Sequence, residues 1–145
     1  DCLLGRSEQA WRTFQKVTPD NPENPISQSG AEPFSYVNSF SSVPEIYGQK
    51  GYAWRTGTSG WFCQLMIEYI LGARRSYQGL VIDPCLPKAL PKAKVTRKFR
   101  GATYDISITN TGKGLDRSIK VDGSPVEGNT LPLVSEGQFK VEVEV

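Results

Sequence analysis

The chain has 145 residues, of which 38% are apolar and 22% charged, as is usual for a globular domain. Its 17 basic and 15 acidic residues leave a net charge of only +2, which argues against a nucleic-acid partner, because such partners need a concentrated basic face. The absence of histidine excludes His-based catalytic triads and zinc sites with His ligands. Three widely spaced cysteines are a poor metal site and a poor disulfide framework, so we expect no metal and a reducing, cytoplasmic setting.

The N-terminal part reads as helices separated by a long loop. Gly5 suits the end of a helix and Ser7 the cap of the next, and the apolar positions from residue 8 to 17 have helical spacing. Four prolines predict an irregular loop over residues 18–33. Apolar residues about three apart then predict a short helix over residues 34–40.

Residues 59–71 predict the most distinctive element, a helix that ends at Gly72 and is apolar nearly all round. Its polar residues, Gln64 and Glu68, lie one turn apart, and Cys63 is expected to be inert packing. Such a helix is buried on most sides, yet the rest of this chain offers too few helices to cover it. Since the chain also lacks an initiator methionine, we expect it to be the end of a larger helical domain or to assemble with something, for which a homodimer is one solution.

The composition changes near residue 79, after which apolar residues recur with a period of two. This pattern, with turns between, predicts about seven strands, over residues 80–82, 94–100, 102–109, 118–121, 124–126, 131–134 and 139–145. We therefore expect an α+β protein, with a helical region over residues 1–78 and a small antiparallel β-sandwich or jelly roll over residues 79–145.

Residues 54–61 concentrate hydroxyls and glycines directly before the apolar helix. The first amides of a helix lack internal partners, glycine lets a ligand approach the backbone, and Thr56 and Thr58 add hydroxyl donors. The segment is therefore a candidate cradle for an anion or phosphate, although it is not a P-loop. The alternative is that Thr58 or Ser59 simply caps the helix.

The remaining charged residues favour structural roles. Glu32 is expected at a helix entry, Asp83 in a turn, and nothing in the sequence singles out Glu45 for acid–base work. Arg74 and Arg75 suit a helix C-terminus. A basic cluster is expected to be solvated surface and comprises Lys92, Lys94, Arg97, Lys98 and Arg100.

Five motifs occur in order along the chain: Glu32-Pro33-Phe34-x-Tyr36, Trp54-x-Thr56-Gly57-Thr58-x-x-Trp61, Tyr69-Ile70-Leu71-Gly72, Gly79-Leu80-x-Ile82-Asp83-Pro84-Cys85-x-Pro87 and Val95-Thr96-Arg97-x-Phe99-Arg100-Gly101-x-x-Tyr104. Together they resemble the C-terminal end of the cellobiose and chitobiose phosphorylase family, glycoside hydrolase family ninety-four. That family includes cyclic β-1,2-glucan synthases of the NdvB type. The resemblance extends from about Leu3 to Val145.

The resemblance implies that residues 1–78 are the last helices of an (α/α)6 catalytic barrel and residues 79–145 a C-terminal β-domain. The implied reaction is inverting phosphorolysis of a β-glucosidic bond, in which inorganic phosphate attacks as co-substrate and gives an α-sugar 1-phosphate. Thr56 and Gly57 correspond to the family's phosphate-binding pair. Thr58 and Asn38, which stands about where many relatives have glutamine, are further candidate contacts to substrate or phosphate.

The resemblance places the family's general acid, an aspartate, upstream of this chain, so none of its residues is expected to be catalytic and the chain alone is expected to be inactive. The implied partners are a β-linked disaccharide or gluco-oligosaccharide and the rest of a parent chain, with no cofactor. A synthase of the NdvB type or a non-catalytic carbohydrate-binding module are the alternatives. The second is disfavoured because all three tryptophans, Trp11, Trp54 and Trp61, belong to the helical half.

Overall fold

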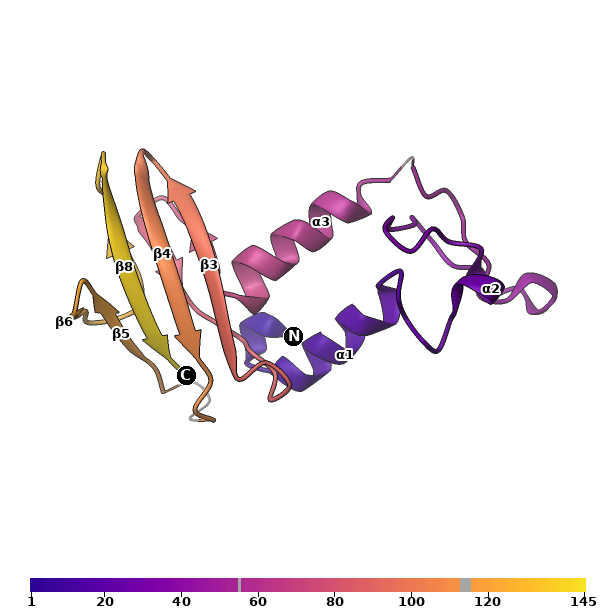
Figure 1. Ribbon diagram of the computed structural model, residues 1–145, viewed down its shortest axis with the longest axis horizontal. Coiled ribbons are helices and arrows are strands. Elements are labelled where there is room, and N and C mark those ends of the chain that lie inside the picture. The colour runs from indigo at the N-terminus through magenta and orange to yellow at the C-terminus, as the bar shows by residue number, and fades with distance from the viewer. Residues whose placement is uncertain (55, 113–115) are drawn as a thin grey trace. The chain divides into compact units, whose positions relative to one another are not determined.

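The computed structural model describes residues 1–54, 56–112 and 116–145. Helices occupy the N-terminal half and strands the C-terminal half, which confirms the α+β class (Figure 1). The chain forms two compact units. The sheet unit comprises Asp1–Ala10 and Leu65–Val145, and the loop unit is the intervening segment Trp11–Gln64.

The N-terminal helices follow the sequence prediction closely. The short 3-10 helix η1 (Cys2–Leu4) ends at Gly5, whose φ of 69° is left-handed and suits glycine. Helix α1 (Ser7–Val17) confirms the amphipathic helix predicted over residues 8–17. Its first turn begins one residue earlier than expected, because the Ala10 N–H donates to the Arg6 carbonyl over 2.9 Å.

Residues 18–33 are mostly irregular, as the prolines predict, with a single turn at α2 (Ile26–Ser29). Residues 34–54 are also mostly irregular, with a single turn at η2 (Pro44–Ile46). The short helix predicted over residues 34–40 is wrong. The Asn38 N–H donates to the Tyr52 carbonyl over 2.9 Å, and Phe40 forms an antiparallel bridge with Lys50. Tertiary packing explains the difference, because Val37 is buried against Ala31 and Ala53 in the small core of the loop unit.

The predicted apolar helix is α3 (Thr58–Gln64) continued by the π-helix η3 (Leu65–Ile70). It ends at Gly72, where a Cβ would lie 2.2 Å from the Asp83 carbonyl carbon, so only glycine fits. The expected burial is only partly present. Ile70 is 1% exposed, but Trp61 is 70% exposed. Cys63 is exposed too, so its expected role as inert packing is wrong for this chain.

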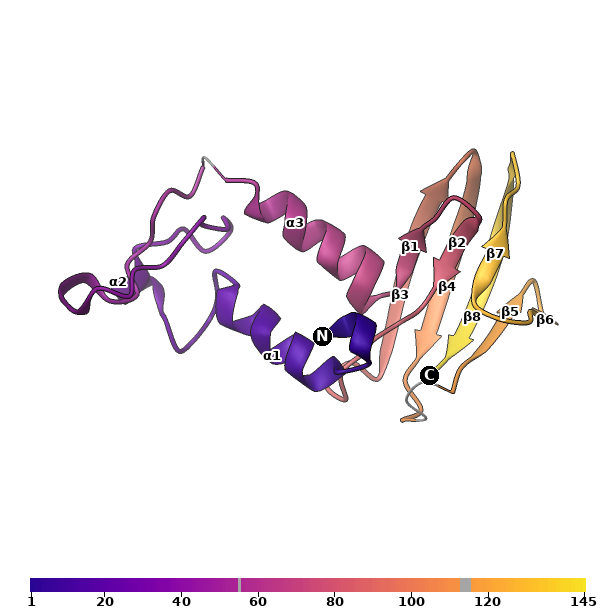
Figure 2. The ribbon, with the colours of Figure 1, turned by 180° about the vertical axis from the view of Figure 1, so that it is seen from behind.

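The strands form two sheets, and all seven predicted strands are present. The three-stranded sheet has the order β1 (Ala73–Arg75), β2 (Gly79–Ile82) and β7 (Thr130–Pro132). The five-stranded sheet has the order β3 (Lys92–Phe99), β4 (Ala102–Thr109), β8 (Gly137–Glu144), β5 (Ser118–Val121) and β6 (Ser124–Pro125). Figure 2 shows β1, β2 and β7 in front of the larger sheet.

The larger sheet is mixed rather than purely antiparallel, which corrects the sequence prediction. β8 lies between β4 and β5, pairing parallel with β4 and antiparallel with β5. The parallel register sets Ile106 opposite Val141 and Ile108 opposite Val143, so one face of both strands is apolar. The largest fully buried apolar side chains of the chain all lie in the sheet unit: Ile70, Leu80, Ile82, Ile106, Ile108, Val141, Val143 and Pro87.

Candidate functional site

The segment before α3 is organised by the Thr56 side chain. Thr56 Oγ1 accepts the Thr58 N–H over 3.0 Å and lies 2.6 Å from Thr58 Oγ1. The Trp61 N–H donates to the Gly57 carbonyl over 3.1 Å, which starts the helix. Thr56 therefore satisfies the first helical amide, a role that sequence reasoning gave to Thr58 or Ser59. Arg55 of the same motif lies outside the described residues.

The backbone conformation at position 57 does not require glycine. Its φ is not in the left-handed region, and a Cβ there would meet Trp61 Cδ1 and Nε1 at 3.6 Å, an ordinary contact. Gly57 itself is exposed, as are Trp61 and Trp54. A backbone without a side chain is thus presented to the outside next to two hydroxyls, which is the geometry that an anion or a sugar oxygen can approach.

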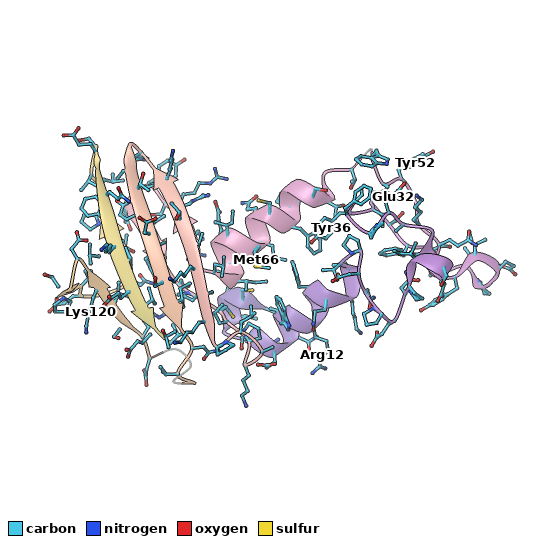
Figure 3. The ribbon with its side chains drawn as sticks, viewed as in Figure 1. Arg12, Glu32, Tyr36, Tyr52, Met66 and Lys120 are labelled. Carbon is cyan, nitrogen blue, oxygen red and sulfur yellow. The ribbon has the colours of Figure 1, made fainter. Side chains whose placement is uncertain are left out.

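A charged network supports the same segment. Glu32 accepts a hydrogen bond from Lys50 Nζ over 2.9 Å, and Trp54 also contributes to lowering the pKa of Glu32. Lys50 is the main cause that holds the pKa of Glu32 below its ordinary value. Figure 3 shows Glu32 and Tyr52 near each other on the irregular part of the loop unit. Glu32 is therefore an ion-pair partner, and its predicted place at a helix entry is wrong.

Aromatic side chains gather around this segment, a feature that single motifs did not reveal. Phe34 and Trp54 are 75% and 73% exposed, and their ring centroids are 6.2 Å apart. Tyr36 stacks on Phe62 of α3 at 4.5 Å, and burial raises the pKa of its phenol. The order of these aromatics in the sequence could have suggested the cluster, but the ribbon pairing that brings residues 34–36 to residues 52–54 is a tertiary feature.

Asn38 lies on the ribbon that leads to Trp54. Its N–H is bonded to the Tyr52 carbonyl, and its Oδ1 accepts from Ser39 Oγ over 3.2 Å. Its side chain is exposed. The hydrogen bonds of Asn38 among the described residues run to Ser39 and Tyr52, and none runs to Thr56 or Gly57.

The sheet unit holds a buried carboxylate that the sequence did not single out. Glu68 on η3 is 6% exposed, and its Oε1 lies 3.1 Å from Arg75 Nε and 2.9 Å from Arg97 Nη2. Arg75 therefore lies in a strand and pairs with Glu68 instead of ending a helix. Arg97, expected on a solvated surface, is turned inward to the same carboxylate. The arrangement is structural, because the guanidinium groups of both arginines form ion pairs with the same Glu68 carboxylate.

Asp83 is structural as expected, though as an ion-pair partner. It pairs with Arg117 and lies 3.8 Å from Arg74 Nη2, so Arg74 does not serve the helix end either. Glu45 is exposed on η2.

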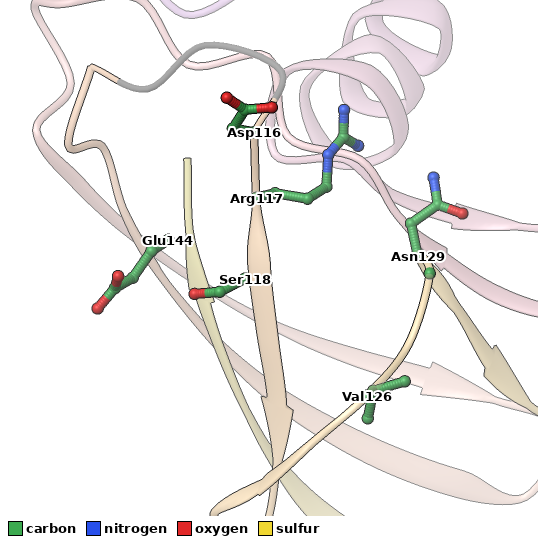
Figure 4. Close-up of a pocket in the computed structure, with 7 residues that line it drawn as sticks. Asp116, Arg117, Ser118, Val126, Asn129 and Glu144 are labelled. Atoms are coloured by element: carbon green, nitrogen blue, oxygen red, sulfur yellow. The ribbon is translucent and has the colours of Figure 1, made fainter.

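A pocket of about 580 Å³ is also present in the sheet unit (Figure 4). Its lining residues are Asp116, Arg117, Ser118, Val126, Gly128, Asn129 and Glu144. The carboxylate of Glu144 points away from Asp116 and Arg117 in Figure 4, so the two acids do not converge on one reacting atom. Among the described residues, no group of three or more Cys, Asp and Glu side chains is placed to hold a metal ion.

The outward face of the five-stranded sheet is polar. Its strands present Lys92, Lys94, Thr96, Lys98, Thr103, Asp105, Ser107, Thr109, Ser118, Lys120, Gln138, Lys140, Glu142 and Glu144. Tyr104 is buried on the opposite face and stacks on Phe139 at 5.4 Å. The described part of this face therefore carries no aromatic row of the kind on which sugar-binding modules stack their ligands. No described helix is long and apolar enough to cross a membrane.

Comparison with known proteins identifies the family to which the chain is similar. Residues 1–72 match the family described as "Glycosyl hydrolase 94 superfamily, catalytic domain". The chain is similar to a solabiose phosphorylase of Paenibacillus borealis, at 34% identity over 150 residues, covering 100% of this chain and 19% of that protein. It is also similar to an N,N'-diacetylchitobiose phosphorylase of Vibrio proteolyticus, at 38% identity over 136 residues, covering 91% of this chain and 17% of that protein.

A third relative is named for a different activity. The cyclic beta-(1,2)-glucan synthase NdvB of Rhizobium meliloti (strain 1021) is 32% identical over 125 residues, covering 82% of this chain and 4% of that protein. The chain thus spans about a fifth or less of the length of these relatives. The matched region includes the whole Thr56–Thr58 segment, α1 and α3.

Proposed function

This chain belongs to the glycosyl hydrolase 94 superfamily, and we propose that it is the C-terminal part of an inverting glycoside phosphorylase. In this proposal residues 1–78 are the last helices of an (α/α)6 barrel and residues 79–145 are a C-terminal β-domain of sandwich type. The parent enzyme cleaves a β-glucosidic bond in a disaccharide or gluco-oligosaccharide with inorganic phosphate, in the cytoplasm. It releases an α-sugar 1-phosphate and needs no other cofactor.

The observation that carries the proposal is the exposed Gly57 backbone beside the Thr56 and Thr58 hydroxyls. Phosphate is already anionic, so its attack requires no general base, only donors that aim it and neutralise its charge. The Thr56 hydroxyl and the Gly57 backbone amide would supply hydrogen-bond donors. The cations that neutralise the phosphate would come from the rest of the parent chain. The proposed general acid is likewise an aspartate of the parent chain, which protonates the leaving oxygen while phosphate attacks from the opposite face.

Asn38 and the aromatic cluster fit a sugar-binding role next to this phosphate site. Exposed Trp54 and Phe34 offer faces on which a sugar ring can stack, and Asn38 offers an amide at the start of the same ribbon. Several relatives carry phosphorylase names with β-linked substrates, such as the 3-O-beta-D-glucopyranosyl-beta-D-glucuronide phosphorylase of Paenibacillus borealis. We propose the same substrate class for the parent of this chain.

The proposal is tested by substituting Thr56 in the parent enzyme. Thr56→Ala removes one hydrogen bond to a charged ligand, and such bonds contribute about 1.5–3 kcal/mol. We therefore expect the KM for phosphate to rise about 10-fold to 100-fold, with the KM for the sugar substrate nearly unchanged. Thr56→Ser keeps the hydroxyl and should restore the KM for phosphate. Ser59→Ala is the matched control, because Ser59 also carries a hydroxyl and is exposed on α3, but the proposal gives it no contact with phosphate.

Two outcomes contradict the proposal. If Thr56→Ala changes the phosphate and sugar KM values equally, Thr56 acts only through the fold of the loop. If the purified 145-residue chain itself turns over a disaccharide and phosphate, the assignment of the general acid to the parent chain is wrong.

The similarity to the NdvB protein supports a second candidate, in which the parent is a cyclic β-1,2-glucan synthase. Product analysis separates the two, because phosphorolysis of a disaccharide releases a sugar 1-phosphate and cyclisation of a β-1,2-glucan releases none. The polar outward face of the five-stranded sheet disfavours the third alternative, a non-catalytic carbohydrate-binding module.

A further inference from the structure

Another pocket of the sheet unit, which we call the turn pocket, lies between two turns. The turn that joins β1 to β2 contributes Arg75, Ser76 and Tyr77, and the turn that joins β3 to β4 contributes Phe99 and Arg100. Its volume of about 380 Å³ lies in the range of sites for small ligands. The candidate phosphate site lies in the loop unit, so the turn pocket is separate from it.

Arg100 occupies a backbone position that does not favour arginine. It forms a two-residue hairpin turn with Gly101, and the two residues have φ values of 48° and 93°. Two positive φ values are typical of a type I′ turn, which favours Asn-Gly or Asp-Gly. The hairpin between β5 and β6 follows this preference, because Asp122 and Gly123 have φ values of 48° and 81°. The turn alone therefore does not explain the arginine at position 100, and its guanidinium group is what asparagine or aspartate would lack.

The backbone holds both walls of the turn pocket in place. A Cβ at Gly101 would collide with the Ser135 carbonyl oxygen, so the β3–β4 turn packs closely on the segment before β8. In the β1–β2 turn, Ser76 Oγ donates to the Gly79 carbonyl over 2.8 Å and accepts the Gly79 N–H over 3.1 Å. The Ser76 hydroxyl is thus used within its own turn. The arginine and aromatic side chains are the groups left to contact a ligand.

The arginines at the turn pocket outnumber the carboxylate that pairs with them. Arg75 pairs with Glu68 through its Nε over 3.1 Å, and Arg97 shares the same carboxylate. Arg97 Nε is buried and has no hydrogen-bond partner in the part of the chain that the structure describes. Arg100 forms no ion pair with any described residue, and its guanidinium carbon lies 5.6 Å from the Phe99 ring centroid. Three guanidinium groups and one carboxylate carry a net charge of +2, which a dianion would neutralise.

We propose that the turn pocket binds a hexose phosphate. Arginine guanidinium groups bind phosphate oxygens with two parallel hydrogen bonds, and a phosphate monoester carries a charge of about −1.5 to −2 at neutral pH. Arg100 and Arg75 would hold the phosphate. Tyr77, whose side chain is 93% exposed, offers a ring face on which the sugar can stack. The inference does not depend on the phosphorylase proposal, because it uses no residue of the loop unit.

The test is an amide NMR titration of the 145-residue chain with glucose 1-phosphate and with glucose 6-phosphate. We expect saturable shifts at residues 75–77 and 99–101. Arg100→Asn removes the guanidinium group and places a residue that suits the turn, so the fold should be unchanged. Loss of a hydrogen bond to a charged ligand should raise the Kd about 10-fold to 100-fold. Lys98→Gln is the matched control, because it removes one positive charge from an exposed position of β3 outside the pocket and should leave the Kd nearly unchanged.

Three further comparisons test the sugar and the location. Tyr77→Ala should raise the Kd about 2-fold to 10-fold, because it removes the stacking face. Glucose and inorganic phosphate should each bind more weakly than the hexose phosphates, because each makes only one set of contacts. Thr56→Ala should leave hexose phosphate binding unchanged, because Thr56 lies in the loop unit.

Four results would overturn the proposal. They are the absence of saturable shifts with both hexose phosphates, an unchanged Kd in the Arg100→Asn variant, an unchanged Kd in the Tyr77→Ala variant, and inorganic phosphate that binds as tightly as the hexose phosphates. Binding that is lost in Thr56→Ala and kept in Arg100→Asn would assign the ligand to the loop unit, and would leave the phosphate site of the proposed function supported while the turn pocket is ruled out.

Discussion

The sheet unit and the loop unit bury apolar surface in very different ways. The sheet unit holds the large fully buried residues, among them Ile82, Ile106 and Val143, in two hydrogen-bonded sheets. The core of the loop unit consists of Ala31, Val37 and Ala53, with Phe40 packed against it. The exposed large apolar side chains of the loop unit include Phe34, Tyr47, Tyr52, Trp54 and Trp61.

Because of this difference, the residues that stabilise the fold and the residues proposed to bind ligand lie in different units. Burial contributes about 25 cal/mol per Å² of apolar surface, so a core of two alanines and one valine stabilises little. The aromatic surface that the loop unit leaves exposed is available to bind a ligand or another part of the protein. The proposed phosphate and sugar contacts, Thr56, Gly57 and Asn38, all lie in this loop unit. The sheet unit, in contrast, holds the largest buried side chains among the described residues.

A buried isoleucine of the sheet unit should show the largest effect on stability. Ile106→Ala removes three heavy atoms from a site that is 2% exposed and should lower the free energy of unfolding by about 2–5 kcal/mol. Urea unfolding followed by circular dichroism measures the loss. Ile46→Ala is the matched control in the loop unit, where the side chain is 44% exposed, and we expect it to change stability by about 0.5 kcal/mol or less. Equal effects of the two substitutions would contradict the comparison.

Removal of the buried carboxylate should be almost as costly. Glu68→Ala leaves Arg97 and Arg75 without their shared anion, and because these arginine side chains are 21% and 63% exposed to water, we expect a loss of about 1–3 kcal/mol, below the full cost of an unpaired buried charge. Glu142→Ala, on the exposed face of β8, is the matched control and should have little effect. A Glu68 variant as stable as the Glu142 variant would show that the arginines find equivalent partners.

We expect the exposed apolar side chains of the loop unit to cause self-association of the chain. We expect static light scattering of the purified chain to give a mass above that of the monomer, with a homodimer as the simplest species. Phe34→Ser removes a side chain that is 75% exposed and should shift the species toward monomer, whereas Lys120→Ser on the exposed face of β5 should not. A monodisperse monomer for the unmodified chain would rule out this expectation.

The smallest expected effect concerns the ion pair that supports the candidate site. Because Lys50 lowers the pKa of Glu32 below its ordinary 4.5, the ion pair stabilises the folded state above that pH. This contribution is lost as the pH falls through the lower, folded-state pKa. Lys50→Met should return the Glu32 pKa toward 4.5, measurable by an NMR pH titration of the Glu32 carboxyl. An unchanged Glu32 pKa in this variant would mean that the Trp54 indole and the backbone, and not Lys50, set its value.

Local patterns predicted most of the elements. The strands at residues 102–109 and 118–121 were predicted with their observed bounds, because alternation has the same period in the sequence and in the sheet. The helix ends at Gly5 and Gly72 were predicted because the left-handed conformation favours glycine. The prediction of a short helix at residues 34–40 was wrong, because an apolar spacing of three also fits an extended ribbon in which other segments bury Val37.

The candidate site stays a prediction, and the structure adds its local geometry. The hydroxyl and glycine content of residues 54–61 indicated an anion site, and the structure shows that Thr56 and Thr58 share one hydrogen-bonded arrangement next to Gly57. The support from Glu32 and Lys50 was missed, because no local spacing relates residues that are 18 positions apart. The roles of Thr56, Gly57, Thr58 and Asn38 toward phosphate stay proposals until the substitutions above are made.

The sequence by itself determined the family, the α+β class, the helix ends and the alternating strands, because each of these depends on residues that are close neighbours in the chain. Only the tertiary structure decided the parallel pairing of β4 with β8, the burial of Glu68 between two arginines and the ion pair of Glu32 with Lys50. These features join residues far apart in the sequence. Their partners are selected by packing and charge in the folded chain, for which a single sequence contains no local signal.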